Sequence, residues 1–170
     1  MTKTRAVSLI SLLAMSFFFA VGTTQRVYSQ AAGQVAASGV LTDSSLGTML
    51  TGMGYEPKPL SKGFLIAVKR GTWTLNIQIV ISPNTERVGM NANLGSVEDP
   101  DAVTAAQWKA LLVSNGDIDP SEFYFDLKQK KLYLHRVMDN RGITPAILRT
   151  QIENFCGNMI DTADLWKFTK

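Results

Sequence analysis

One histidine, His135, and one cysteine, Cys156, are the residues of this 170-residue sequence best suited to nucleophilic or metal chemistry. A zinc site needs several such ligands at defined spacing, and the sequence contains no CxxC, HxxxH or HExxH motif. A Cys–His catalytic pair would need the two side chains in contact. Cys156 falls on the apolar stripe of a predicted helix, where burial disfavours the thiolate. We therefore expect a surface histidine on a strand and a small buried cysteine, with no metal ligands.

Two acidic clusters are the candidates for calcium binding or carboxylate catalysis. The carboxylates within residues 98–101 precede a predicted helix, where the helix dipole and capping favour negative charge. Those within residues 117–122 follow Gly116, whereas an EF-hand loop places its glycine after the first three ligands. We expect both clusters to serve loops and helix ends. A small secreted hydrolase that uses carboxylates remains the alternative, although no pair is singled out.

Phosphate-binding and nucleophile motifs are also missing, since the sequence has no GxGxxG, GxxxxGK[ST] or GxSxG. The basic stretch 128–131 lies at a predicted hairpin tip, where solvation explains its lysines. The 17 basic residues include Lys3, Arg5 and Arg26, and without these three the chain has as many basic residues as its 14 acidic ones. The pI of about 9.1 therefore gives no indication of nucleic-acid binding. We expect no catalytic residue, no cofactor and no nucleic-acid partner.

The N-terminus resembles an export signal. A short basic start precedes residues 6–21, an uncharged apolar run of 16 residues that is shorter than most membrane-spanning helices. Ser29 and Ala31 suit the −3 and −1 positions of a cleavage site. We expect a signal peptide over residues 1–31, export through the general secretion route, and a periplasmic or extracellular product. An uncleaved leader that anchors the protein in the membrane is the alternative.

After the leader, residues 32–42 are small and uncharged, which predicts a flexible linker, and residues 43–168 are expected to form one domain. Hydrophobic periodicity and capping residues predict its elements. The expected helices cover Asp43–Met53, Thr104–Asn115 with Gly116 as its stop, and a long segment after the Thr144 cap; the expected strands cover Phe64–Lys69, Trp73–Ser82, Arg87–Leu94, Glu122–Leu127 and Leu132–Met138.

Strict alternation of apolar and polar residues along Trp73–Ser82 and Arg87–Leu94 predicts strands with one buried face. Such strands are typical of antiparallel sheets, and the apolar face needs a helical layer to cover it. We expect an α+β fold, a two-layer sandwich in which a five-stranded, mostly antiparallel sheet carries helices on one face. The expected element order is α-β-β-β-α-β-β-α, and the open face is polar with interspersed aromatic residues.

The segment from Leu111 to Glu153, LLVSNGDIDPSEFYFDLKQKKLYLHRVMDNRGITPAILRTQIE, resembles the YbjN-domain proteins and the wider type III secretion chaperone-like superfamily. Shared features are a helix with an Asn-Gly stop, a hairpin with an aromatic first strand, and a closing helix that starts at Thr-Pro. Upstream, LGTMLTGMGYE, a Gly-Phe strand and the Trp73 strand are similar to the family's opening helix and meander. The resemblance covers about Asp43 to Trp166.

This resemblance implies a protein-binding function and homodimerisation, and it supplies no catalytic motif. The implied dimer surface involves the second helix, which makes Trp108, Leu111 and Leu112 candidates for self-association, while Tyr124 and Tyr133 are candidates for the partner face. We expect an exported, non-catalytic, chaperone-like or regulatory module that binds an unknown protein. The alternatives are the hydrolase and a membrane-anchored envelope structural protein, and membrane contact is expected only if the leader is kept.

Overall fold

The computed structural model describes residues 39–170. The predicted signal peptide and residues 32–38 of the predicted linker lie outside this range. The elements in chain order are α1 (Asp43–Gly52), β1 (Lys58–Pro59), β2 (Phe64–Arg70), β3 (Trp73–Ile81), β4 (Arg87–Ser96), the 3₁₀ turn η1 (Pro100–Ala102), α2 (Ala105–Asp117), β5 (Ser121–Asp126), β6 (Lys131–Asp139), α3 (Pro145–Asp161) and α4 (Ala163–Trp166).

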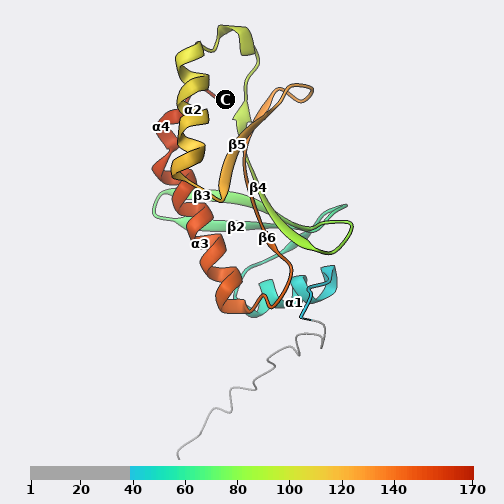
Figure 1. Ribbon diagram of the computed structural model, residues 1–170. Coiled ribbons are helices and arrows are strands. Elements are labelled where there is room, and N and C mark those ends of the chain that lie inside the picture. The colour runs from blue at the N-terminus through green and yellow to red at the C-terminus, as the bar shows by residue number, and fades with distance from the viewer. Residues whose placement is uncertain (1–38) are drawn as a thin grey trace, which may run out of the picture. The chain divides into compact units, whose positions relative to one another are not determined.

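The strands form one antiparallel sheet in the order β1-β2-β3-β4-β6-β5 (Figure 1). The predicted α+β class and antiparallel sheet are confirmed, but within residues 39–170 the sheet has six strands instead of five. The additional strand, β1, pairs with β2 through Lys58↔Leu65 and Pro59↔Phe64. Two prolines hold this stretch extended, and a proline is tolerated there because β1 lies at the edge of the sheet.

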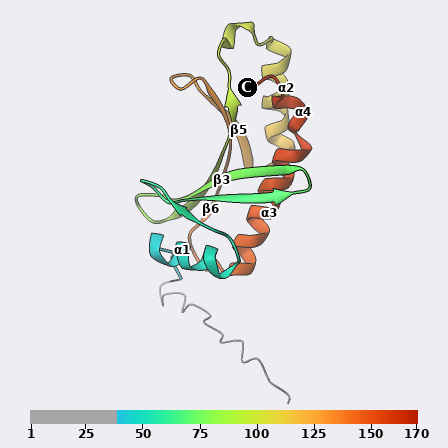
Figure 2. The same ribbon diagram turned by 180° about the vertical axis from the view of Figure 1, so that it is seen from behind.

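Alternation along the strands gives the sheet one apolar face, which we call the inner face. Leu75, Ile77 and Ile79 of β3 are buried, whereas Thr74 and Asn76, which alternate with them, are exposed. Figures 1 and 2 show α2, α3 and α4 on one side of the sheet. The predicted two-layer arrangement is therefore present.

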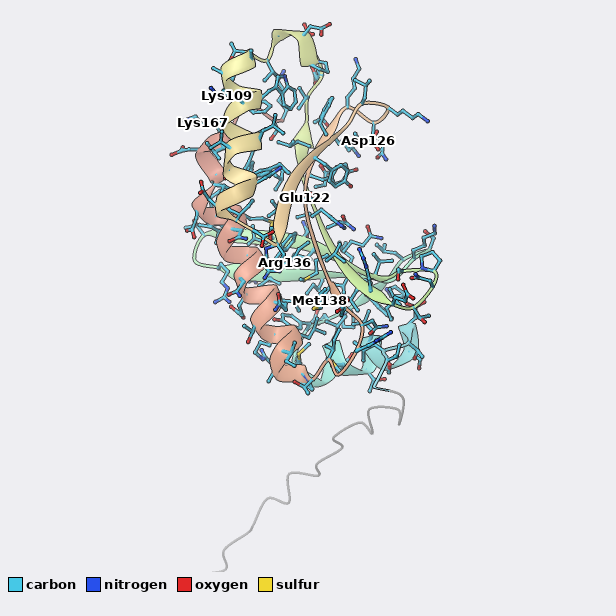
Figure 3. The ribbon with its side chains drawn as sticks, in the orientation of Figure 1. Lys109, Glu122, Asp126, Arg136, Met138 and Lys167 are labelled. Atoms are coloured by element: carbon cyan, nitrogen blue, oxygen red, sulfur yellow. The ribbon has the colours of Figure 1, made fainter. Side chains whose placement is uncertain are left out.

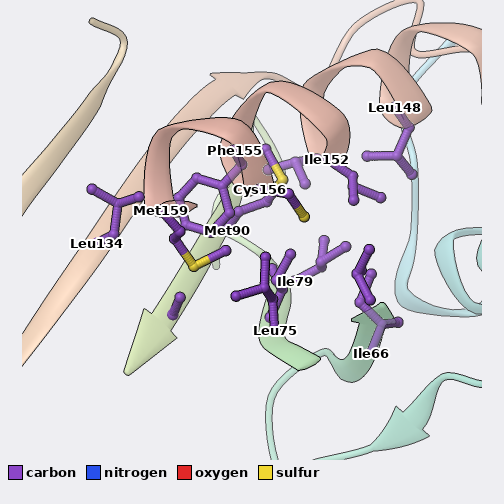
Figure 4. Packing of buried hydrophobic residues seen from close by; sticks show 14 of the residues in the cluster. Ile66, Leu75, Ile79, Met90, Leu134, Leu148, Ile152, Phe155, Cys156 and Met159 are labelled. Atoms are coloured by element: carbon purple, nitrogen blue, oxygen red, sulfur yellow. The ribbon is translucent and has the colours of Figure 1, made fainter. Parts of the chain in front are cut away.

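Helix α3 supplies most of the helical side of the core. It begins as predicted, with Thr144 accepting a hydrogen bond from Ile147 N and Pro145 in the first turn. Its buried residues project toward the inner face (Figure 4). They are Leu148, Ile152, Phe155, Cys156 and Met159. The expectation of a small buried cysteine is confirmed, and burial raises the pKa of the Cys156 thiol.

Two predicted element ends are wrong for local reasons. Helix α2 continues through Gly116 to Asp117, because the Ile118 N–H still donates to Ser114 O. Strand β5 ends at Asp126, one residue early. The Asp126 carboxylate accepts hydrogen bonds from the backbone N–H groups of Lys128 and Gln129, which starts the turn and leaves Leu127 72% exposed.

Asn140 fastens the start of α1 to the corner between β6 and α3. Its side chain is fully buried, accepts from Leu41 N at 2.9 Å, and donates to Leu41 O and Thr85 O, each at 2.8 Å. Gly142, two residues further along, adopts a positive φ in this turn. Leu41 is also buried, so the packed part of the chain includes the end of the predicted linker.

Candidate functional site

A groove lies between helix α2 and the edge strand β5, with a volume of about 320 Å³. Its lining is almost wholly apolar or aromatic. The lining residues are Trp108, Leu111, Leu112, Phe123, Tyr124, Phe125 and Leu132. Four of the five predicted partner-binding residues therefore meet at one place, although α2 and β5 present them from different segments. The fifth, Tyr133, lies beside them on β6.

Helix α2 is held in position by its N-terminal cap and by an aromatic cluster. Thr104 forms the predicted cap: its hydroxyl accepts from Gln107 N, and the Gln107 side chain accepts from Thr104 N. Trp108 lies 5.2 Å from Phe125 and 5.8 Å from Phe168, measured between ring centroids. These contacts half-bury Trp108, so its ring forms one wall of the groove.

The leucines of α2 have different roles. Leu111 is 2% exposed and belongs to the core, whereas Leu112 is 70% exposed and Val113 is 61% exposed. Leu111 therefore forms the floor of the groove, and Leu112 is the member of the predicted pair that is accessible to another molecule. Exposed apolar side chains that adjoin an apolar groove enlarge the apolar surface, and such contiguous surface is typical of interaction sites.

Tyr124 connects the groove with the open face of the sheet, which we call the outer face. Its ring stacks on Tyr133 with 5.0 Å between centroids and 10° between planes. Burial raises the pKa of both phenols, and the neighbouring Tyr133 ring adds to the increase at Tyr124. Both phenols therefore remain neutral near pH 7, and the pair forms a flat aromatic surface.

The outer face is polar beyond this pair, as the sequence predicts. The register aligns Gln78 with Asn91, Asn91 with His135, and His135 with Glu122. His135 Nδ1 lies 2.6 Å from Asn91 Oδ1, and because a carboxamide oxygen can only accept, Nδ1 carries the proton. Cys156 lies on the opposite side of the sheet, so the two residues form no pair.

His135 gives the protein a predictable pH dependence. Burial lowers its pKa below the ordinary value near 6.5, against an opposing effect of Glu122. The unfolded chain therefore takes up the proton more readily, and stability should fall as the pH drops below about 6.5 toward the folded-state value. We expect His135→Gln to reduce the decrease in the urea denaturation midpoint between pH 7.5 and pH 5.5. An equal decrease of the midpoint in the wild type and the variant would contradict the assignment of this pH dependence to His135. No other histidine can contribute, because His135 is the only one in the sequence.

Two residues whose side chains bond to β5 were missed by the sequence analysis. Asn115, in the last turn of α2, accepts from Phe123 N at 2.7 Å and donates to Phe123 O at 3.3 Å. Arg136 is buried on the inner face, where its guanidinium donates to Gln151 and Ser121. The alternation along β6 places Arg136 on this face. A cationic residue at an inward-facing strand position is the sequence feature that could have identified it. Nothing local in the sequence indicates the contact of Asn115.

Residues of the acidic stretch 98–101 and of the basic stretch 128–131 make contacts that stabilise turns and loops. Asp99 caps η1 by accepting from Asp101 N, and Lys130 Nζ donates to Glu98 O. Within residues 39–170, no three His, Cys, Asp or Glu side chains gather closely enough to hold a metal ion. Figure 3 shows Glu122 and Asp126 on β5, and Lys109 and Lys167 on the helical layer.

No family model matches the sequence, and no curated protein matches it. The YbjN assignment therefore stays a prediction. The fold is similar to a chain of the HopA1–SchA chaperone–effector complex, with 12% identity and a TM-score of 0.47 over 68% of this chain and 88% of that chain. It is also similar to a chain of the ExsC–ExsE complex, with 16% identity and a TM-score of 0.47 over 73% of this chain and 89% of that chain.

Among the helices of residues 39–170, none has both the length and the apolar character needed to cross a membrane.

Proposed function

We propose that this protein is a non-catalytic binding module that receives apolar side chains of another polypeptide in the groove between α2 and β5. The observation that carries the proposal is the exposed Leu112 beside a groove lined by Trp108 and Tyr124. Accessible aromatic side chains in an apolar patch are typical of surfaces that bind protein.

The rigidity of the groove supports this function. Its floor belongs to the hydrophobic core, one wall is fixed by the contacts of Trp108 with Phe125 and Phe168, and Asn115 bonds α2 directly to β5. A preformed surface loses little conformational entropy when it binds. The groove therefore suits a partner that inserts a few apolar side chains.

We further propose that the module acts outside the cytoplasm, on a partner in the envelope or the surroundings of the cell. The support is the N-terminal sequence, with its basic start, apolar run and small residues before position 32. N-terminal sequencing of the protein recovered from its source cell tests this: a start near Ala32 is expected, and a start at residue 1 would favour the membrane anchor.

Replacing Leu112 with aspartate should weaken partner binding at least about tenfold, because a charge at the rim would be desolvated on binding. The free energy of unfolding should change by less than about 0.5 kcal/mol, since the side chain is exposed. The measurement is quantitative capture of proteins from extracts of the source cell, using the tagged full-length protein.

The matched control is Ile147→Asp on α3, where an apolar side chain is 46% exposed and does not line the groove. A protein captured by the wild type and by the Ile147 variant but lost with the Leu112 variant supports the proposal. Equal capture by all three proteins, or recovery of nothing beyond copies of this chain, counts against it.

A further inference from the structure

Strand β5 borders the groove and is the last strand in the sheet order. Within residues 39–170, β5 has β6 on one side and no strand on the other. An edge strand normally presents unpaired N–H and C=O groups, and these groups attract strands of other molecules. Whether the outward-facing N–H and C=O groups of β5 already make hydrogen bonds therefore decides whether the sheet can be extended at this edge.

Asn115 occupies these groups at the centre of the strand. Its carboxamide oxygen accepts from Phe123 N at 2.7 Å, and its carboxamide nitrogen donates to Phe123 O at 3.3 Å. A carboxamide that makes both bonds copies the pattern of one residue of a neighbouring strand. It therefore fills the place that an added strand would need.

The adjoining positions leave little room for pairing. Backbone groups of an antiparallel strand alternate in direction, so Ser121 and Phe125 face outward together with Phe123. The Ser121 N–H donates to Ile118 O at 2.8 Å, inside the turn that leads into the strand. Among residues 39–170, Phe125 is the remaining position of β5 whose outward-facing N–H makes none of these bonds. A single position gives an added strand too few hydrogen bonds to hold it.

We infer that Asn115 guards the edge of β5 against strand pairing, so that the groove admits partner side chains and excludes a partner strand. Admission of partner side chains rests on the proposed function, whereas protection of the sheet edge stands without it. Loss of the guard should expose the edge to a second copy of the same strand, since two β5 strands can pair antiparallel about a two-fold axis.

The experiment compares the full-length wild type with Asn115→Ala and Asn115→Asp by analytical ultracentrifugation over a wide range of concentration. The alanine variant should form a discrete, reversible species larger than any formed by the wild type. Its Phe123 amide should also exchange hydrogen about tenfold faster at low concentration, because that amide loses its acceptor. A mass and an amide exchange rate unchanged from the wild type would overturn the inference.

The aspartate variant distinguishes protection of the β5 edge from a general effect of residue 115 on stability. Aspartate still accepts from Phe123 N but repels Phe123 O, so this variant should lose stability while its charge continues to oppose an incoming strand. We expect it to keep the wild-type mass. If both variants associate in proportion to their loss of stability, Asn115 has only a structural role and the inference is wrong. Asn154→Ala, an exposed asparagine on α3, is the control for substitution of a helix amide and should change nothing.

Discussion

Replacing Asn140 with alanine should lower the free energy of unfolding by about 3 kcal/mol, which is large for removal of one polar side chain. The substitution leaves Leu41 N–H, Leu41 O and Thr85 O without their buried partner. Each unsatisfied group costs about 1–3 kcal/mol, and partial access of water reduces the total. Urea denaturation monitored by circular dichroism gives the value.

The location of the loss is also predictable, because Asn140 is the link between Leu41 and the corner after β6. The Leu41 amide should lose its protection from hydrogen exchange, while amides in the centre of β3 keep theirs. Asn154→Ala should change the free energy of unfolding by less than about 0.5 kcal/mol. A similar small loss for Asn140→Ala would show that water replaces the side chain and would refute its role as a fastening residue.

Replacing Phe155 with alanine should have the largest effect on stability, about 3–5 kcal/mol. Phe155 is fully buried on α3 and packs with residues of the inner face (Figure 4). The loss combines the transfer free energy of the ring with the cavity that the rigid sheet cannot close. Chemical denaturation of the full-length protein provides the measurement.

Phe155→Leu is the matched variant, since it removes less volume and keeps an apolar side chain. We expect it to lose clearly less stability than the alanine variant. Equal losses would indicate that ring shape, and not cavity volume, determines the packing of α3 on the sheet. A loss below about 1 kcal/mol for alanine would mean that the core collapses around the site.

The amino-acid sequence predicts the parts of this fold that depend on periodicity. The alternation along β3 identified both faces of the sheet, and Thr104 and Thr144 marked two helix starts correctly. The errors come from contacts that periodicity does not report. Gly116 is compatible with a helix when the Ile118 N–H still bonds backward to Ser114 O, and β1 depends on pairing with β2.

The candidate site was predicted in its composition but not in its geometry. Leu111 and Leu112 are adjacent in the sequence and of the same type, yet one is core and the other is surface. Their difference depends on how α2 is rotated against β5, which is set by Trp108 and Asn115. These contacts join segments on separate elements, so no local pattern indicates them.

The most direct test of the central claim places a photoactivatable amino acid at position 112 of the full-length protein in its source cell, with position 147 as the control. We predict that position 112 crosslinks to one discrete polypeptide through a segment rich in apolar residues, and that position 147 does not. The same products from both positions, or crosslinks from position 112 only to other copies of this chain, would contradict the account.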